Sequence, residues 1–362
     1  MAQFACYTCG KTAPLDTRSL CSCGGLFRLD FAPPQYDPAL LDTAEWNIFR
    51  YRAFMPPLSE LWREVTLGEG MTATVMYRDK LWFKLDYAMP TLSFKDRGAA
   101  ALIWLCKTIG VKSVVQDSSG NAGNAVAAYC ARAGIACRIF VPSGTSPSKV
   151  KMIEAHGADC VVFDGTRDET ADACRKIALD EGCYYANHVY NPMFYQGTKT
   201  FIYEIYEQLG KIPDNLFIPV GNGTLLIGSQ LALNELYTAG CIKSLPRIFI
   251  VQSERCAPLY NTGTAPRTVT PEPTYAEGIA IGKPMRGAEI LDSAGYGGQR
   301  VVITAPEAGI IPAREELSRS GFHVEHTTAA TYAAYKAYTT GHFIEGDSLI
   351  PLCGAGLKSD KA

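Results

Sequence analysis

Hydrophobic and polar positions along the middle of the chain switch repeatedly between the period of a strand and the period of a helix. Short apolar runs predict strands at 111–115, 137–141, 160–163 and 183–186. Amphipathic runs between them predict helices at 124–133, 147–156 and 168–180. Strands that alternate with helices at this spacing form a parallel sheet with helices on both faces, because the crossovers are right-handed. The pattern therefore predicts an α/β fold.

The same kind of pattern flanks this block on both sides. Before it, short strands are expected at 75–77 and 81–85, followed by an alanine-rich helix at 98–105. After it, a buried strand at 216–220 leads into a helix at 225–237, and another strand is expected at 349–352. The chain thus holds two regions of alternating strands and helices.

Composition limits the classes of function. The chain has 362 residues, 47% hydrophobic and 19% charged, which is enough for two domains and a small appendage. Its net charge of -2 gives no electrostatic footprint for nucleic acid. No apolar run approaches the ~20 residues that span a bilayer, and the N-terminus lacks a basic stretch followed by an apolar one. We expect a cytoplasmic protein that binds neither nucleic acid nor membrane.

Cysteines are frequent, and their distribution is uneven. Thirteen are present, an odd number, and most lie in apolar segments, as free thiols do in a reducing compartment. The first four form two close pairs, Cys6 with Cys9 and Cys21 with Cys23. Four thiolates from two turns can bind zinc tetrahedrally. Because the second pair is C-x-C instead of the usual C-x2-C, a structural zinc and a ribbon that has lost its metal both stay open.

Lys95 is the candidate for chemistry. It lies in a turn-like stretch, Met89–Gly98, between two apolar regions. Next to Phe94 and small residues the amine would be partly desolvated, which lowers its pKa and makes it a nucleophile. The alternative is a lysine that caps a loop and pairs with Asp96. A phosphate-binding loop farther along the chain favours the nucleophile.

A first anion-binding turn is predicted where the strand 111–115 meets the following helix. It runs from Asp117 to Asn124 and includes Ser118, Ser119, Gly120, Asn121 and Ala122. Backbone and side-chain donors at the positive end of a helix suit a small anion such as a carboxylate. The same residues are also ordinary turn and N-cap formers.

A second anion-binding turn follows the strand 216–220. Its residues Gly221, Asn222, Gly223 and Thr224 open a helix, where glycines let several N–H groups converge on a phosphate. The turn is neither a Walker loop nor a dinucleotide fingerprint. A phosphate without a nucleotide, together with a reactive lysine, indicates pyridoxal 5′-phosphate (PLP), its phosphate held by this turn and its aldehyde by Lys95.

Four motifs in this order resemble threonine synthase, a fold-type II PLP enzyme of the tryptophan synthase β-like superfamily. They are Pro90–Gly98, Ser118–Gly123, Pro219–Thr224 and Gly354–Lys358. The resemblance spans nearly the whole chain. It implies two doubly wound domains of fold-type II PLP enzymes plus a small N-terminal cysteine-rich ribbon. The expected boundaries are 1–30 for the ribbon, 31–97 with 198–362 for the large PLP-binding domain, and 98–197 for the small βαβ domain.

The resemblance also implies roles for residues. Lys95 holds the cofactor and acts as the general base, Asn121 faces the cofactor 3′-oxygen, and Ser118 to Ala122 take the substrate carboxylate. Gly221 to Thr224 take the cofactor phosphate. Cys353 falls against the pyridine nitrogen, where a thiol is a weak donor, so the chemistry favours elimination or replacement over transamination. A buried structural cysteine is the alternative for Cys353.

Further substrate-site candidates follow from the intervening segments. Glu277 and Gly278 lie in a loop expected to cross the cofactor face, and His188 supplies a hydrogen-bonding group. Glu325 is a weaker candidate, because it starts a helix and caps it in any case.

The sequence leaves several amino acids as candidates for the substrate. The lead is O-phosphohomoserine, converted to threonine and phosphate by a homodimeric lyase. Where threonine synthases would carry an arginine after the Asn-Pro pair, Pro192 precedes Met193, and Ala355 stands where a histidine is common. A rebuilt phosphate site would need other cations: Arg97, Lys149, Lys151 or Lys199. The alternatives are a β-replacement synthase resembling cysteate or cysteine synthase, a threonine or serine ammonia-lyase, and a silent amino-acid-binding protein.

Overall fold

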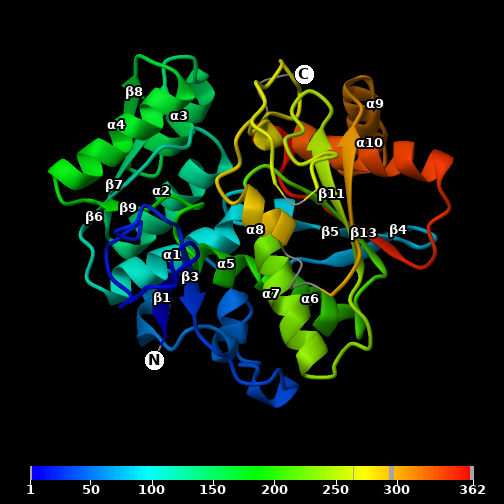
Figure 1. Ribbon diagram of the computed structural model, residues 1–362, viewed down its shortest axis with the longest axis horizontal. Helices are drawn as coiled ribbons and strands as arrows, with labels where there is room; N and C mark the ends of the chain where they lie inside the picture. Colours follow the sequence, from blue (N-terminus) through cyan, green and yellow to red (C-terminus); the bar gives the residue numbers. More distant parts are fainter. Residues whose placement is uncertain (1, 264, 293–296, 359–362) are drawn as a thin grey trace. The chain divides into compact units, whose positions relative to one another are not determined.

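The chain forms two units, each made of two separate segments (Figure 1). The computed structural model describes residues 2–263, 265–292 and 297–358. Unit 1 contains the chain up to Gly70 and Lys95–Thr198, and unit 2 contains Met71–Phe94 and the chain from Lys199 onward. The backbone therefore passes between the units directly before Lys95.

A four-stranded parallel sheet is the centre of unit 1. Its order is β8-β7-β6-β9, with the strands β6 (Ser113–Gln116), β7 (Ala136–Pro142), β8 (Asp159–Phe163) and β9 (Tyr184–Tyr185). Val114 pairs with Cys137 on one side and Tyr184 on the other. The strands predicted at 111–115, 137–141, 160–163 and 183–186 are confirmed, and their ladder is parallel, as the crossover rule requires.

Helices cover both faces of this sheet. The helices of unit 1 are α1 (Lys95–Thr108), α2 (Asn121–Ala133), α3 (Pro147–Glu154), α4 (Arg167–Asp180) and α5 (Met193–Thr198). Neighbouring strand residues point to opposite faces. Accordingly, Val114 packs in the core built with α1 and α2, whereas Val115 packs in the core that includes Cys174 of α4.

The N-terminal ribbon is a three-stranded antiparallel sheet in the order β2-β1-β3, formed by β1 (Gln3–Cys6), β2 (Thr12–Ala13) and β3 (Phe27–Asp30). Rings of Phe4 and Phe27 stack with centroids 5.0 Å apart. The segment up to Gly70 that follows the ribbon also packs in unit 1, whereas we expected residues 31–97 in the large domain. Apolar anchoring explains the difference: the Trp104 indole of α1 donates to the Ser59 carbonyl at 2.8 Å and meets the Phe49 ring edge-on.

Unit 2 is built on a six-stranded sheet in the order β12-β11-β10-β13-β5-β4. Its strands are β4 (Thr74–Arg78), β5 (Leu81–Lys84), β10 (Asn215–Pro219), β11 (Arg247–Ser253), β12 (Arg300–Ala305) and β13 (Ser348–Pro351). Every pair is parallel except β4 with β5, which a tight turn joins as an antiparallel hairpin. The sheet is therefore mixed at one edge, where the sequence pattern predicted two short strands at 75–77 and 81–85.

The helices of unit 2 are α6 (Thr200–Leu209), α7 (Thr224–Thr238), α8 (Gly287–Asp292), α9 (Glu307–Arg319) and α10 (His326–Gly341). α10 packs on β10, β11, β12 and β13, and α9 packs on α10 (Figure 1). The rings of Phe217 and Phe249 stack at 4.2 Å between centroids, and Tyr335 of α10 meets Phe217 edge-on. Among the described residues, every helix falls short of the length and apolarity needed to cross a membrane.

Candidate functional site

Lys95 begins α1, so it lies at a helix start and not in the turn-like stretch that the sequence predicted. The residues before it are tied to the end of the β13 strand. Phe94 donates its amide N–H to the Cys353 carbonyl at 2.9 Å, and Ala355 donates to the Leu92 carbonyl at 3.1 Å. Leu92 adopts a left-handed φ of 62°. These contacts define the backbone from which Lys95 projects.

Phe194 of α5 connects Lys95 with His188 inside unit 1. The Lys95 amine lies 5.7 Å from the centroid of the Phe194 ring, and the His188 ring lies 5.8 Å from it. The ring needs the space left by Gly98, where a Cβ would come within 2.2 Å of it. Packing of the Phe194 ring therefore explains why the position one turn after Lys95 is a glycine.

His188 is buried and neutral. Burial lowers the pKa of His188 well below its ordinary value, and the positive charge of Lys95 lowers it further. Its Nδ1 has no hydrogen-bond partner in the described part of the chain. The ring therefore offers a hydrogen-bonding group without charge.

The turn after β6 presents unpaired donors at the start of α2. Gln116 accepts the Ser118 amide N–H at 3.0 Å, and the Ser118 hydroxyl accepts that of Gly120 at 3.3 Å. Within the described residues, three amide N–H groups here donate no hydrogen bond: those of Ser119, Ala122 and Gly123. They lie at the positive end of a helix, which suits a carboxylate.

Asp117 joins this turn to the segment that carries His188. Its carboxylate accepts hydrogen bonds from the Tyr185 hydroxyl at 2.8 Å and from the Asn187 amide at 2.7 Å. Asn187 in turn accepts the Val189 amide N–H at 2.8 Å. Unit 1 therefore gathers Lys95, His188 and the turn 118–122, which are far apart in sequence.

Unit 2 supplies the turn Gly221–Thr224, between β10 and α7. Gly223 has a left-handed φ of 76°, and a Cβ there would come within 2.4 Å of Ile290. A Cβ on Gly221 would come within 2.9 Å of Ile281. In the described part of the chain, the amide N–H groups of Gly221, Asn222 and Gly223 donate no hydrogen bond, although both glycines are buried. Such buried, unpaired donors at the start of a helix are costly unless an anion accepts from them.

Cys353, Glu277 and Gly278 are held by the first turn of α10. Cys353 is 1% exposed and donates its amide N–H to the Thr328 hydroxyl at 3.1 Å. Gly278 donates its amide N–H to the Thr327 hydroxyl at 3.2 Å. Glu277 is exposed beside it. Unit 2 thus brings these candidates onto one helix start.

The two threonines were not among the predicted site residues. Glu325 was only a weak candidate, yet it contacts Gly354 directly. Its amide N–H donates to the Gly354 carbonyl at 2.9 Å, and a Cβ added to Gly354 would come within 2.4 Å of the Glu325 carboxylate. A Glu-x-Thr-Thr run at a helix start is ordinary capping chemistry, so it gave no separate signal. Their importance follows from the long-range contact with residues 353 and 354.

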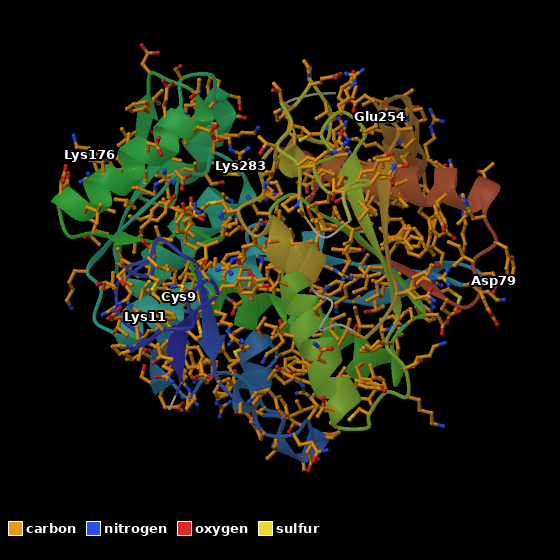
Figure 2. The ribbon with its side chains drawn as sticks, in the orientation of Figure 1. Cys9, Lys11, Asp79, Lys176, Glu254 and Lys283 are labelled. Carbon is orange, nitrogen blue, oxygen red and sulfur yellow. The ribbon has the colours of Figure 1, made fainter. Side chains whose placement is uncertain are left out.

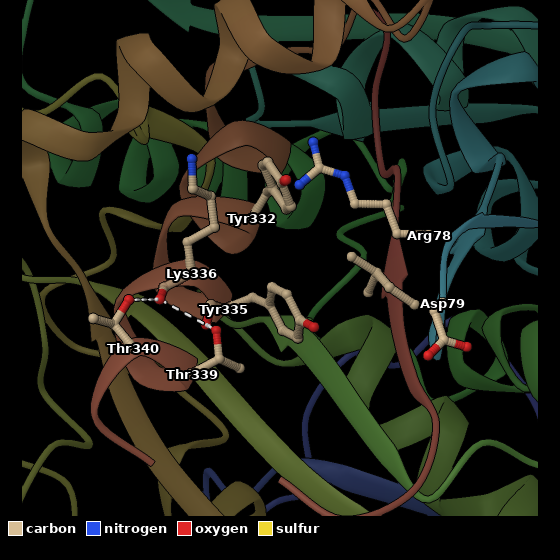
Figure 3. A pocket seen from close by; sticks show the side chains of 8 residues that line it. Arg78, Asp79, Tyr332, Tyr335, Lys336, Thr339 and Thr340 are labelled. Carbon is tan, nitrogen blue, oxygen red and sulfur yellow. Dashed lines mark hydrogen bonds between the residues drawn. The ribbon is translucent and has the colours of Figure 1, made fainter. Parts of the chain in front are cut away.

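A cavity of about 300 Å³ in unit 2 lies elsewhere on the surface of that unit (Figure 3). Its lining residues are Arg78, Asp79, Leu81, Tyr332, Tyr335, Lys336, Thr339 and Thr340. Arg78, Tyr332 and Lys336 all bond to the single carboxylate of Glu316. The predicted site residues, all within the described part of the chain, lie outside this lining, and the cations of the cavity are already paired.

The residues that the resemblance assigns to PLP fit that group chemically. They include a primary amine next to a neutral histidine, buried N–H donors that lack acceptors in the described part of the chain, and a buried thiol beside hydroxyl groups. The four cysteines predicted as metal ligands also come together, with all Sγ atoms within 4.8 Å of one another.

Comparison with known proteins agrees with this chemistry. The family model described as pyridoxal-phosphate dependent enzyme matches residues 65–354. The threonine synthase of Methanocaldococcus jannaschii is 30% identical, over 99% of this chain and 93% of its own length. That of Mycobacterium tuberculosis is 30% identical over 83% of this chain and 86% of its own length.

Solved structures show the same fold. The processed form of threonine deaminase isoform 2 from Solanum lycopersicum aligns with a TM-score of 0.67 and 22% identity, covering 79% of this chain and 79% of its own. An O-ureido-L-serine synthase aligns with a TM-score of 0.68 and 20% identity, covering 85% of this chain and 95% of its own. The chain has the fold of fold-type II PLP enzymes, and threonine synthases are among its relatives. It belongs to the family of pyridoxal-phosphate dependent enzymes.

Proposed function

We propose that the protein is a threonine synthase, a lyase that converts O-phosphohomoserine and water into threonine and inorganic phosphate. The observation that carries this proposal is the identity of 30% with the Methanocaldococcus jannaschii threonine synthase over 99% of the chain. Similarity of that extent includes the ribbon as well as both units.

Bound PLP supplies a carbonyl for covalent attachment and a conjugated ring that withdraws electrons from the substrate Cα. Lys95 would hold the cofactor and move the proton at Cα. Its neighbour His188, whose pKa is lowered by burial, is too weak a base to compete for that proton. The Gly221–Thr224 amides hold the cofactor phosphate. Asn121 would serve the 3′-oxygen of the cofactor, and Cys353 would offer its pyridine nitrogen a weak donor, as the resemblance implies.

The turn Ser118–Ala122 holds the substrate carboxylate through its unpaired N–H groups. His188, Glu277 and Gly278 contact the rest of the substrate. Threonine synthases and ammonia-lyases both act on small amino acids, so this part of the site would suit either reaction.

The substrate phosphate needs positive charge or helix-start donors. Lys199 is not available, because it is 0% exposed and its amine lies 3.0 Å from the Glu235 carboxylate. Arg97 is also completely buried. Lys149 and Lys151 both lie on α3, where Lys149 is partly exposed and Lys151 is exposed, so both side chains reach solvent. We assign the phosphate to these two lysines.

A second candidate is a threonine or serine ammonia-lyase. Residues 187–195 contain no Asp, Glu, Lys or Arg, and His188 is neutral, so this segment offers a leaving group only neutral donors. A hydroxyl leaving group would need less charge than a phosphate dianion.

One experiment separates the two candidates. Purified protein with PLP is incubated with O-phosphohomoserine, threonine or serine, and phosphate, ammonia and keto acid are measured. Release of phosphate with formation of threonine supports the synthase. If threonine or serine instead yields ammonia and a keto acid, and phosphohomoserine yields no phosphate, the protein is an ammonia-lyase and the threonine synthase proposal fails.

Lys149→Ala and Lys151→Ala then test the phosphate site. At least one should lower kcat/KM for phosphohomoserine about tenfold, as expected for a lost contact of ~1.4 kcal/mol. Lys176→Ala, on α4, is the matched control, since it removes another lysine of unit 1.

We further propose a homodimer that acts in the cytoplasm and binds no nucleic acid. All the cysteines are free thiols, which suits a reducing compartment. Gel filtration with light scattering would test the dimer.

A further inference from the structure

The N-terminal ribbon carries a cluster of sulfur atoms that the proposed reaction does not use. The four ligand candidates come from two turns: Cys6 and Cys9 at the end of β1, and Cys21 and Cys23 before β3. The closest sulfurs belong to different turns, with Cys6 Sγ 3.5 Å from Cys23 Sγ and Cys9 Sγ 3.7 Å from Cys21 Sγ. Figure 2 labels Cys9 in this cluster.

These separations match a tetrahedral metal site. Zn–S bonds of about 2.3 Å place the sulfurs of a tetrahedron roughly 3.8 Å apart. Sulfurs in a disulfide would instead be bonded at about 2.05 Å, and all four thiols are free. The set consists of four cysteine sulfurs, and four thiolates fill all positions of zinc, as in a structural site.

The backbone conformation of the second turn explains how its short C-x-C spacing can present two ligands. Gly24 adopts a φ of 82° and donates its N–H to the Cys21 carbonyl at 2.8 Å, while the Cys21 N–H donates to the Gly25 carbonyl at 3.0 Å. This tight turn directs both sulfurs to the same side. A Cβ on Gly25 would come within 2.7 Å of Cys6 Sγ, so glycine is needed for the two turns to meet.

The residues on either side of this turn pack against an apolar cluster that includes neighbours of His188. Leu20 and Leu26 both contact the apolar cluster that contains Tyr185, Val189 and Tyr190. Tyr185 also donates to Asp117, beside the proposed carboxylate turn. A displacement of the turn 21–25 would therefore act on the apolar cluster to which the segment 185–190 belongs.

We propose that Cys6, Cys9, Cys21 and Cys23 bind one Zn²⁺ in a closed tetrahedral site, and that this metal positions the segment 185–190 through Leu20 and Leu26. Four thiolates on one zinc would hold the two turns of the ribbon together, in addition to the packing of Phe4 and Phe27 in the core of unit 1. The second half of the proposal rests on the proposed function, since it concerns the segment next to the substrate turn.

Metal content tests the first half without reference to activity. The holoenzyme, purified without chelator, should contain one zinc per chain by elemental analysis, and replacement by Co²⁺ should give the thiolate-to-cobalt absorption of a tetrahedral site. Cys21→Ser with Cys23→Ser should lose the metal, whereas Cys241→Ser, in unit 2, should retain it. Metal-free protein, or protein with disulfides among these four cysteines by intact mass, would overturn the proposal.

Ligand affinity tests the second half. Zinc-depleted holoenzyme should keep its visible cofactor absorption but bind the amino-acid substrate at least about tenfold more weakly, measured by spectral titration. Leu26→Ala, which keeps all four cysteines, should retain zinc and show the same direction of change. Unchanged affinity after zinc removal would overturn the positioning role while leaving both the metal site and the proposed reaction standing.

Discussion

The amide N–H of Phe94 donates a hydrogen bond of 2.9 Å to the carbonyl oxygen of Cys353. This bond ties the residue before Lys95 to the loop that follows β13, more than 250 positions later in the chain. The Cys353 amide is itself fixed by the Thr328 hydroxyl. The chain that leads into Lys95 is therefore held by contacts between residues far apart in the sequence.

Replacing Lys95 by alanine should abolish the visible absorption of the lysine-bound cofactor and lower kcat by about 10²–10⁴-fold, since the residue both holds PLP and moves a proton. Far-UV circular dichroism should stay unchanged. Lys112→Ala is the control, because that lysine is exposed in the same unit. Wild-type absorbance and turnover in Lys95→Ala would refute the assignment.

Replacing Gly223 by alanine should weaken PLP binding at least tenfold in a fluorescence titration. The new Cβ would meet Ile290 at 2.4 Å and disturb the phosphate-binding turn. Gly240→Ala is the matched control, since its φ of 73° is similar but its Cβ would meet nothing within 4 Å. Both changes carry a left-handed backbone cost of about 1–2 kcal/mol. Equal PLP affinity in the two variants would show that the turn does not bind the phosphate.

Glu69 should make the protein less stable as pH rises. Burial raises the pKa of Glu69 to about 7, although the Leu67 amide and the Tyr129 hydroxyl donate to its carboxylate. The folded state binds this proton more tightly than the unfolded state does. The contribution of Glu69 to the free energy of unfolding is therefore complete below pH ~4.5, and it falls by roughly 3 kcal/mol as the pH rises to about 7.

The measurement is the urea midpoint of the wild type and of Glu69→Gln between pH 5 and 8. The variant lacks the titrating group, so its midpoint should change less over this range. Glu154→Gln, at an exposed position of α3, should follow the wild type. Parallel pH profiles for wild type and Glu69→Gln would rule out this contribution.

The ion pair of Lys84 with Glu204 should be sensitive to loss of one partner. Its atoms lie 2.8 Å apart, and both side chains are 0% exposed. Lys84→Met alone should destabilise unit 2 by ~3–5 kcal/mol, because it leaves a buried carboxylate without its cation. Lys84→Met combined with Glu204→Leu should recover much of that loss. Additive effects in urea unfolding would contradict the coupling, and Arg319→Ala, from an exposed pair, should hardly shift the midpoint.

Most of the fold could be predicted from local sequence. The predicted strands and helices of unit 1 agree with β6 to β9 and α2 to α4, because their periodicity reflects which side of each element is buried. The position of the turn Gly221–Thr224 between a strand and a helix was also recognisable, since glycines follow a buried apolar run there. The exact start of α1 was not: the helix was expected from Gly98 but begins at Lys95, directly after Phe94, whose amide bonds to the distant Cys353.

The amino-acid sequence by itself indicated the α/β class, the candidate lysine, the two candidate anion-binding turns and the four paired cysteines, because each depends on residues that are close in the chain. Only the tertiary structure decided that His188 is neutral, that Lys199 is paired with Glu235, and that Thr327 and Thr328 hold the loops of unit 2. Protonation and pairing depend on burial and on neighbours far along the chain, which a local pattern does not specify.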